Sequence, residues 1–183
     1  FTLEATVRVM HEIGRGIELL VNPDFIDGTS AAPWIIGWCT GATGTFRITE
    51  DSQYLPDGEP AAAIVTVTRR YASIQQNVTG QVKLMGDGKY LFRMLMRAYD
   101  PAQPIDTSTP CFSLTGTQSQ TILFRPHTKI GEEYVEYYQI IDVTNAQDLQ
   151  TVIFHTSTWK SRDDAEDGPR SFIIAGCSLI YLG

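Results

Sequence analysis

Short runs of β-branched and aromatic residues recur along the chain, and Gly, Pro, Asn or Asp ends each of them. No window keeps apolar residues at the i, i+3, i+4, i+7 spacing of an amphipathic helix, although one helical turn is expected within Val143–Leu149. The runs predict about ten or eleven strands, which is typical of an all-β sandwich, a jelly roll of two antiparallel sheets. The predicted strands are Thr2–Val9, Trp34–Cys39, Gly44–Thr49, Ala61–Arg69, Tyr71–Thr79, Lys89–Tyr99, Cys111–Leu114, Gln118–Arg125, Glu133–Val143, Gln150–Thr156 and Ser171–Leu182.

Apolar and polar residues alternate within several of these runs, which indicates strands with one buried and one wet face. The run over 90–99 is the clearest case, and its predicted core face carries Tyr90, Phe92, Met94, Met96 and Ala98. In the run over 71–78, Ile74 and Gln76 share the more apolar face, while Tyr71 and Gln75 share the opposite one.

Composition limits the classes of protein that this chain can be. Its 183 residues suit one domain, predicted as a single module over 1–183, and 43% hydrophobic against 19% charged residues exclude a disordered chain. No apolar run reaches the ~18 residues of a membrane span, so no membrane partner is expected. The formal net charge of −7 argues against nucleic-acid binding but is compatible with neutral ligands such as sugars.

Cysteines and turns add smaller constraints. Cys39, Cys111 and Cys177 have no zinc-binding spacing, and either one disulfide with a free thiol or three buried thiols would fit them. Gly86-Asp87-Gly88 is predicted to be a turn between two strands. Because the chain starts at Phe1 rather than Met, we expect it to be a module of a longer polypeptide.

Four segments, in order, resemble one known family. They are LLVNPDFIDG at 19–28, VTRRYAS at 67–73, a two-part segment of QVKL at 81–84 and GKYLFRMLMR at 88–97, and IIAGCSL at 173–179. Together they resemble the carbohydrate-binding modules of the family 4/9/22 type, which are jelly rolls attached to enzymes that degrade plant polysaccharides, including those of cellulosomes. Each segment alone has low specificity, and the order of all of them carries the resemblance.

The resemblance implies a function, and the departures from the family pattern modify it. It implies a non-catalytic module that is secreted, bacterial and monomeric, and that targets a catalytic domain of the same polypeptide to its polysaccharide. The family has a carboxylate after the opening Phe and an Asp pair in the last strand, which help to hold a calcium ion. Here these positions are Ile26 and Ala175-Gly176, so we expect no cofactor and no metal, although Asp24 and Asp27 remain.

A sugar site needs flat aromatic faces for the apolar side of a pyranose. The family's binding Trp aligns with Ile74, so the platform is expected elsewhere. Trp159 lies in a very polar stretch and is the first candidate, with a loop side chain folded back on the sandwich as the alternative. Trp34 and Trp38 share one face of a predicted strand, and core packing is the alternative to a sugar contact for Trp34.

Polar candidates must bond the sugar hydroxyls. Tyr71 and Gln75 share one strand face, and a second strand presents Arg93, Arg97 and Tyr99 together, as a concave binding face would. For both groups, the alternative to a binding site is an ordinary solvent-exposed sheet face. Arg70 matches the family's Arg, with pinning of a loop as its alternative. His155 shares a face with Trp159 if the strand continues, with a structural hydrogen bond as its alternative.

We therefore predict a module that binds a β-linked plant polysaccharide, of the xylan or β-glucan and xyloglucan type. A structural or protein-interaction domain of a large extracellular protein is the first alternative, and it would show no sugar affinity. A jelly-roll lyase or esterase is the second. The histidines lack metal spacing and no G-x-S-x-G motif occurs, but Glu132, Glu133 and Glu136 could supply a carboxylate pair.

Overall fold

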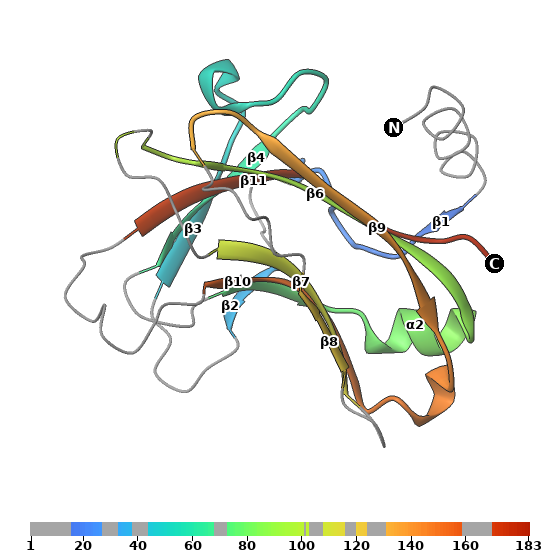
Figure 1. Ribbon diagram of the computed structural model, residues 1–183. Helices are drawn as coiled ribbons and strands as arrows, with labels where there is room; N and C mark the ends of the chain where they lie inside the picture. Colours follow the sequence, from blue (N-terminus) through green and yellow to red (C-terminus); the bar gives the residue numbers. More distant parts are fainter. Residues whose placement is uncertain are drawn as a thin grey trace.

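The computed structural model describes residues 16–26, 33–37, 44–67, 73–100, 102, 108–115, 120–123, 131–158 and 170–183. Within these residues, eleven strands form two antiparallel sheets that pack face to face (Figure 1). The predicted all-β sandwich is confirmed. The expected strand at 2–9 lies outside the described residues, as do residues 38–43, which include Trp38 and Cys39 at the end of the predicted strand Trp34–Cys39.

The larger sheet has the order β3-β4-β11-β6-β9, and β1 pairs with the far end of β11. Its strands are β1 (Ile17–Glu18), β3 (Gly44–Thr49), β4 (Ala62–Val67), β6 (Gly88–Ala98), β9 (Val135–Val143) and β11 (Arg170–Tyr181). The smaller sheet has the order β2-β5-β10-β7-β8. Its strands are β2 (Ile35–Gly37), β5 (Ser73–Asn77), β7 (Ser108–Thr115), β8 (Gln120–Leu123) and β10 (Thr151–Thr158).

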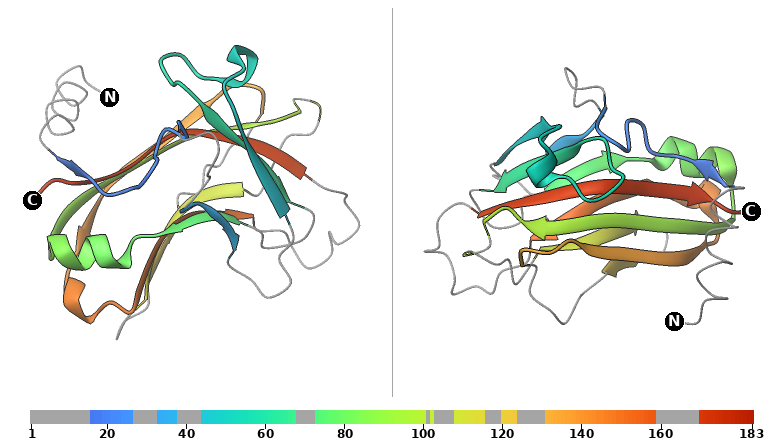
Figure 2. Two further views of the ribbon diagram at one scale, coloured as in Figure 1. Left: turned by 180° about the vertical axis from the view of Figure 1, so that it is seen from behind. Right: turned by 90° about the horizontal axis from the view of Figure 1, so that it is seen from above.

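Both sheets bend in the same direction, and the five-stranded sheet lies on the inside of the bend (Figures 1 and 2). The right-handed twist of strands produces such bending in packed sheets. The outer face of the five-stranded sheet is therefore concave, and the outer face of the six-stranded sheet is convex.

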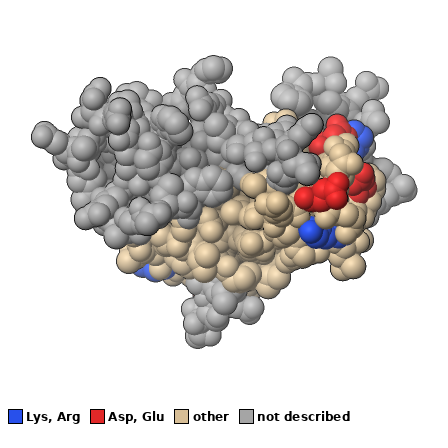
Figure 3. All heavy atoms as spheres, turned by 90° about the horizontal axis from the view of Figure 1, so that it is seen from below, with Lys and Arg blue, Asp and Glu red and all other residues tan. Residues whose placement is uncertain are grey.

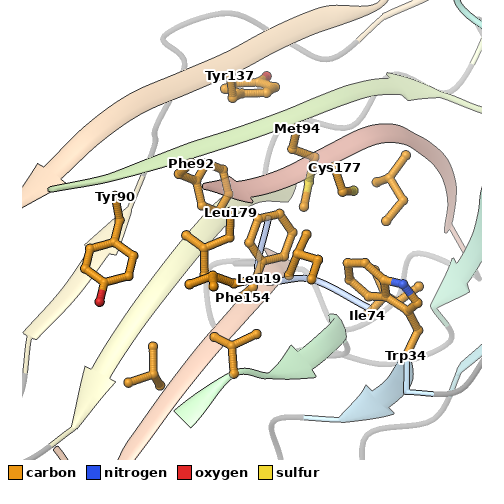
Figure 4. Close-up of a cluster of buried hydrophobic side chains, with 14 of the residues drawn as sticks. Leu19, Trp34, Ile74, Tyr90, Phe92, Met94, Tyr137, Phe154, Cys177 and Leu179 are labelled. Carbon is orange, nitrogen blue, oxygen red and sulfur yellow. The ribbon is translucent and has the colours of Figure 1, made fainter. Parts of the chain in front are cut away.

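One apolar core fills the space between the sheets (Figure 4). Phe92 of β6 stacks on Phe154 of β10 at 4.5 Å between ring centroids, and Trp34 meets Phe154 edge-on at 5.8 Å. All five residues predicted for the core face of 90–99 are buried, so the alternation in β6 identifies its inner face correctly. Full burial of one such side chain stabilises the fold by about 1.5–3 kcal/mol.

The segment 19–26 connects the two sheets along one side. The backbone N–H of Leu19 donates to the carbonyl of Leu179 in β11, at 2.9 Å. Two residues later, Gln76 of β5 accepts from the N–H of Val21 and donates to its carbonyl. Gln76 has no exposed surface, so these two bonds satisfy an amide that would otherwise be costly to bury.

The β3–β4 connection covers part of the outer face of the six-stranded sheet. It contains the short 3-10 helix η1 (Ser52–Tyr54), which Asp51 caps by accepting from the N–H of Gln53. Tyr54 and Leu55 pack on a second, smaller apolar cluster around Ile64 and Ile173.

Two short helical elements complete the described chain. η2 (Ala146–Asp148) provides the helical turn predicted before β10. The helix α2 (Thr79–Met85) was not predicted, because it is short and its one buried residue is Val82. Gly86 ends this helix with a φ of 88°, so Gly86-Asp87-Gly88 connects a helix to β6, and its predicted role as a turn between two strands is wrong. No helix among the described residues is both long and apolar enough to cross a membrane.

Candidate functional site

Strand register aligns a row of residues across the five-stranded sheet. Its members occupy paired positions on consecutive strands: Ile35, Gln75, His155, Cys111 and Leu123. Ile74, Phe154 and Ile36, the sequence neighbours of three members of this row, pack into the core, so Ile35, Gln75 and His155 lie on the opposite, concave face. The sequence predicted two of these positions, Gln75 and His155, as parts of a binding face.

The five strands that form this face contain no Asp, Glu, Lys or Arg. Figure 3 views the molecule from below, and the described charged residues gather mainly at the end where α2 and η2 lie. The described part of the concave face is therefore built from uncharged polar and apolar residues.

His155 is a buried part of this face, with 1% of its surface exposed. Burial lowers the pKa of His155 to about 4, so the imidazole is neutral at pH 7. Its Nδ1 lies 2.9 Å from the carbonyl oxygen of Thr156. Because a carbonyl only accepts, this bond requires the proton on Nδ1 and makes Nε2 the acceptor. The burial favours the structural role over direct sugar contact.

Gln75 lies next to His155 and is half-buried. Its amide group lies across Gly37 of the edge strand β2, where a Cβ built on Gly37 would come within 2.7 Å of Nε2. The neighbouring Asn77 is exposed, but its Oδ1 accepts from both the N–H and the hydroxyl of Thr79. Because Ile74 and Gln76 are buried on the inner side, Gln75 lies on the outer, concave side of β5.

Arg93 does not belong to this face, because β6 lies in the six-stranded sheet. Its guanidinium forms ion pairs with Glu136, at 2.7 Å, and with Glu59, at 3.4 Å. It also donates to the carbonyl of Gly176, which has a φ of 51° and lies at a bulge in β11. A Cβ on Gly176 would lie 2.6 Å from the Glu59 carboxylate, so this packing requires glycine.

Arg97 and Tyr99 also hold loops against the convex face. Arg97 donates to the carbonyls of Gln53 and Glu132, and its guanidinium lies over the rings of Tyr54 and Tyr134. The Tyr99 ring stacks on Tyr54 at 5.3 Å, and their hydroxyls are hydrogen-bonded. The expectation that these residues join Gln75 on one concave face is corrected, since the two groups lie on opposite sheets.

Trp34 lies in the core rather than on a binding face. Its side chain is 2% exposed, and its indole N–H donates to the carbonyl of Asn22. The ring also packs on Phe25 at 5.1 Å. Core packing, the alternative stated for Trp34, is therefore the role that the structure shows. Three further candidates, Trp159, Tyr71 and Arg70, lie outside the described residues.

The positions where the family holds calcium offer no side-chain oxygen ligands here. Ile26 exposes its apolar side chain, and Ala175 is buried in the smaller apolar cluster. Glu18 lies nearby, but its carboxylate accepts from the backbone N–H groups of Leu19, Leu20 and Leu179. No group of three or more His, Cys, Asp or Glu within the described residues could hold a metal ion. Asp27 lies outside them, and the absence of calcium stays a prediction.

Sequence reasoning missed two residues of the concave face, Ile35 and Gly37. Both were included in a predicted strand, but only the tryptophans of that strand were considered as ligands. The pattern Trp34-Ile35-Ile36-Gly37 does contain a signal, because burial of Trp34 and Ile36 forces Ile35 and Gly37 outward. Ile35 is 52% exposed.

Comparisons with known proteins give matches of structure only. No family model matches the sequence, and no curated protein matches it. A xylan-binding module of family 22 from Paenibacillus barcinonensis Xyn10C has a similar structure, with a TM-score of 0.63 at 10% identity, over 91% of this chain and 96% of that one.

Two structures from Clostridium thermocellum Xyn10B are also similar. The C-terminal family 22 module gives a TM-score of 0.53 at 14% identity, over 84% of this chain and 89% of that one. The second structure is a family 22 module joined to a GH10 xylanase module, complexed with xylohexaose. It gives a TM-score of 0.56 at 11% identity, over 91% of this chain and 29% of that one. Further matches include parts of enzymes, such as an α-L-arabinofuranosidase. The chain therefore has the β-sandwich fold of the family 22 carbohydrate-binding modules.

Proposed function

We propose that the protein is a non-catalytic carbohydrate-binding module, which binds a neutral β-linked plant polysaccharide on the concave face of the five-stranded sheet. The observation that carries this proposal is the complete absence of charged residues from the five strands of that sheet. A polysaccharide without ionised groups needs hydrogen bonds and apolar contacts, and charged side chains would have to lose water to approach it.

The dimensions of the sheet also suit a chain of sugars. Neighbouring strands lie about 4.8 Å apart, so the row from Ile35 to Leu123 crosses about 19 Å of sheet. That row places an uncharged residue on each of the five strands beneath a ligand that crosses the strands. An extended internal stretch of polysaccharide therefore matches the face better than a single small sugar.

Similar structures support a choice of ligand. The neighbours from Paenibacillus barcinonensis are named as xylan-binding domains, and one from Clostridium thermocellum is joined to a GH10 module. We take xylan as the first candidate ligand and a β-glucan or xyloglucan as the second. By the same reasoning, the module belongs to a secreted bacterial enzyme and raises the local concentration of an attached glycoside hydrolase at its substrate.

Affinity electrophoresis tests this function directly. The protein is run in native gels that contain xylan, barley β-glucan, xyloglucan, mannan or pectin. We expect retardation on xylan or a β-glucan and none on pectin, because the five described strands of the concave face offer no cation to its carboxylates. Absence of retardation on every neutral glycan would reject the function and favour an interaction domain.

Variants locate the binding face in the same experiment. Gln75→Ala changes the concave face and is expected to reduce retardation. Tyr138→Ser is the matched control, because Tyr138 is exposed on the outer face of the other sheet. Trp159→Ala tests the predicted aromatic platform separately. If Tyr138→Ser abolishes retardation and Gln75→Ala does not, the binding site lies on the convex face instead.

A further inference from the structure

The edge of the concave face at β2 and β5 combines an apolar side chain, a glycine and an amide. Ile35 pairs with Gln75 in the strand register, and Gly37 pairs with Ser73. The Ile35 side chain is 52% exposed, while its sequence neighbour Trp34 is buried in the core. It offers an apolar surface beside the Gln75 amide.

The Gln75 side chain occupies the space above Gly37. A Cβ built on Gly37 would lie 2.7 Å from Nε2, 2.8 Å from Cδ and 3.1 Å from Oε1 of Gln75. All three atoms of the amide are within these distances, so the amide plane lies over the glycine. Any side chain at position 37 would displace it.

Two other side-chain amides of β5 form hydrogen bonds away from Gly37. Gln76 points to the inner side, where it bonds the backbone of Val21. Asn77 accepts two hydrogen bonds from Thr79 at the start of α2. Gln75 is the amide of this strand that lies over Gly37, in the space that a side chain at position 37 would fill.

We propose that Gly37 is a positioning residue for sugar binding, which holds the Gln75 amide flat at a subsite for one neutral pyranose beside Ile35. This inference rests on the proposed function and adds a subsite to it. An amide offers an acceptor oxygen and a donor nitrogen side by side, which matches two adjacent hydroxyls of a pyranose. Ile35 then packs against the apolar C–H face of the same ring.

The substitution Gly37→Ala separates positioning from folding. The clash of its Cβ is with the far end of a flexible side chain, so Gln75 can rotate away while β2 keeps its place. We expect the melting temperature to stay near that of the wild type and the affinity to fall. Loss of one positioned hydrogen-bonding group corresponds to about 5- to 10-fold in affinity.

The experiment compares Gly37→Ala, Gln75→Ala and the double variant by isothermal titration calorimetry with xylohexaose and cellohexaose. Each single variant is expected to lose about 5- to 10-fold in affinity, and the double variant no more than Gln75→Ala alone. In ¹H–¹⁵N spectra, Gly37→Ala is expected to shift the side-chain NH₂ signals of Gln75. Gly131→Ala is the matched control, because a Cβ there meets nothing within 4 Å.

Each outcome decides between the two proposals. Wild-type affinity in Gly37→Ala, or additive losses in the double variant, would overturn the positioning role and leave the function intact. Absence of binding by the wild-type protein to either oligosaccharide and to the polysaccharides in gels would instead reject the proposed function, and the subsite with it.

Discussion

The two sheets share one core but differ on their outer faces. The six strands of the larger sheet contain eight charged residues, which are Glu18, Arg47, Lys89, Arg93, Arg97, Glu136, Asp142 and Arg170. The five strands of the smaller sheet contain none. On the convex face, Arg93 and Arg97 bond loops that cross the sheet. Arginines on a sheet face can therefore have the structural role of holding loops in place. The uncharged face is the one suited to a neutral ligand.

The largest expected effect tests what the sheets share. Phe92 and Phe154 come from opposite sheets, are fully buried and stack at 4.5 Å. Phe92→Ala and Phe154→Ala should each lower the free energy of unfolding by about 3–5 kcal/mol, because each leaves a cavity in the common core. Urea denaturation measures both.

The double variant Phe92→Ala/Phe154→Ala should lose less than the sum of the two, since both substitutions enlarge one cavity. Strict additivity would show that the two rings do not share one packing site, and the description of a common core would then need revision.

His155 should make the stability of the concave sheet depend on pH. Its pKa is lowered to about 4 by burial, whereas an unfolded His titrates near 6.5. The unfolded state therefore binds more protons below pH 6.5, and stability should fall as the pH falls from about 6.5 to about 4, by about 3 kcal/mol in total. The adjacent positions across the sheet, Gln75 and Cys111, bear no carboxylate that would oppose this.

Urea denaturation at several pH values, on wild type and His155→Gln, measures this contribution as the difference between the two pH profiles. Carboxylates elsewhere change the stability of both proteins equally, so their contribution cancels in this difference. Parallel profiles between pH 6.5 and 4 would contradict a buried, neutral His155.

Much of the fold was predictable from local sequence pattern. The bounds of Gly44–Thr49 agree with the prediction, and the alternation in β6 identified its buried face because strand side chains have a strict period of two. The helix α2 escaped prediction, since it has a single buried residue and no side-chain cap. A seven-residue helix with one buried residue has no apolar periodicity that could be detected in the sequence.

The candidate site was predicted only in part. Alternation separates the two faces of one strand, but it does not say which sheet the strand joins. Arg97 and Gln75 therefore looked equivalent in sequence, and strand pairing assigns β6 and β5 to different sheets. Alternation places Gly37 on the outer face, but its contact with Gln75 was not predictable, because that side chain comes from another strand.

Removal of the Arg93 guanidinium should affect stability but not sugar binding. Its partner Glu59 is 14% exposed, so Arg93→Met leaves a poorly hydrated carboxylate without its cation. We expect a loss of about 1–2 kcal/mol in unfolding free energy. Lys89→Met is the control, because the pair of Lys89 with Asp142 is well exposed, and it should change stability by less than about 1 kcal/mol.

Retardation of Arg93→Met on xylan gels should equal that of the wild type. A selective loss of retardation in a folded Arg93→Met protein would place the sugar on the convex face and reverse the assignment of roles to the two sheets.

The smallest effect on stability is expected for Ile35→Lys, which adds a charge to the uncharged face. Ile35 is 52% exposed on an edge strand, so the substitution should change the free energy of unfolding by about 0.5 kcal/mol or less. The new ammonium group should create retardation on pectin at low salt, and this retardation should disappear at about 0.5 M NaCl because salt screens exposed charges. Ile17→Lys is the matched control, with 53% exposure on a strand of the other sheet. If both variants gain pectin retardation equally, the charge acts through the whole molecule, and the absence of charge from the concave face does not by itself select a neutral ligand.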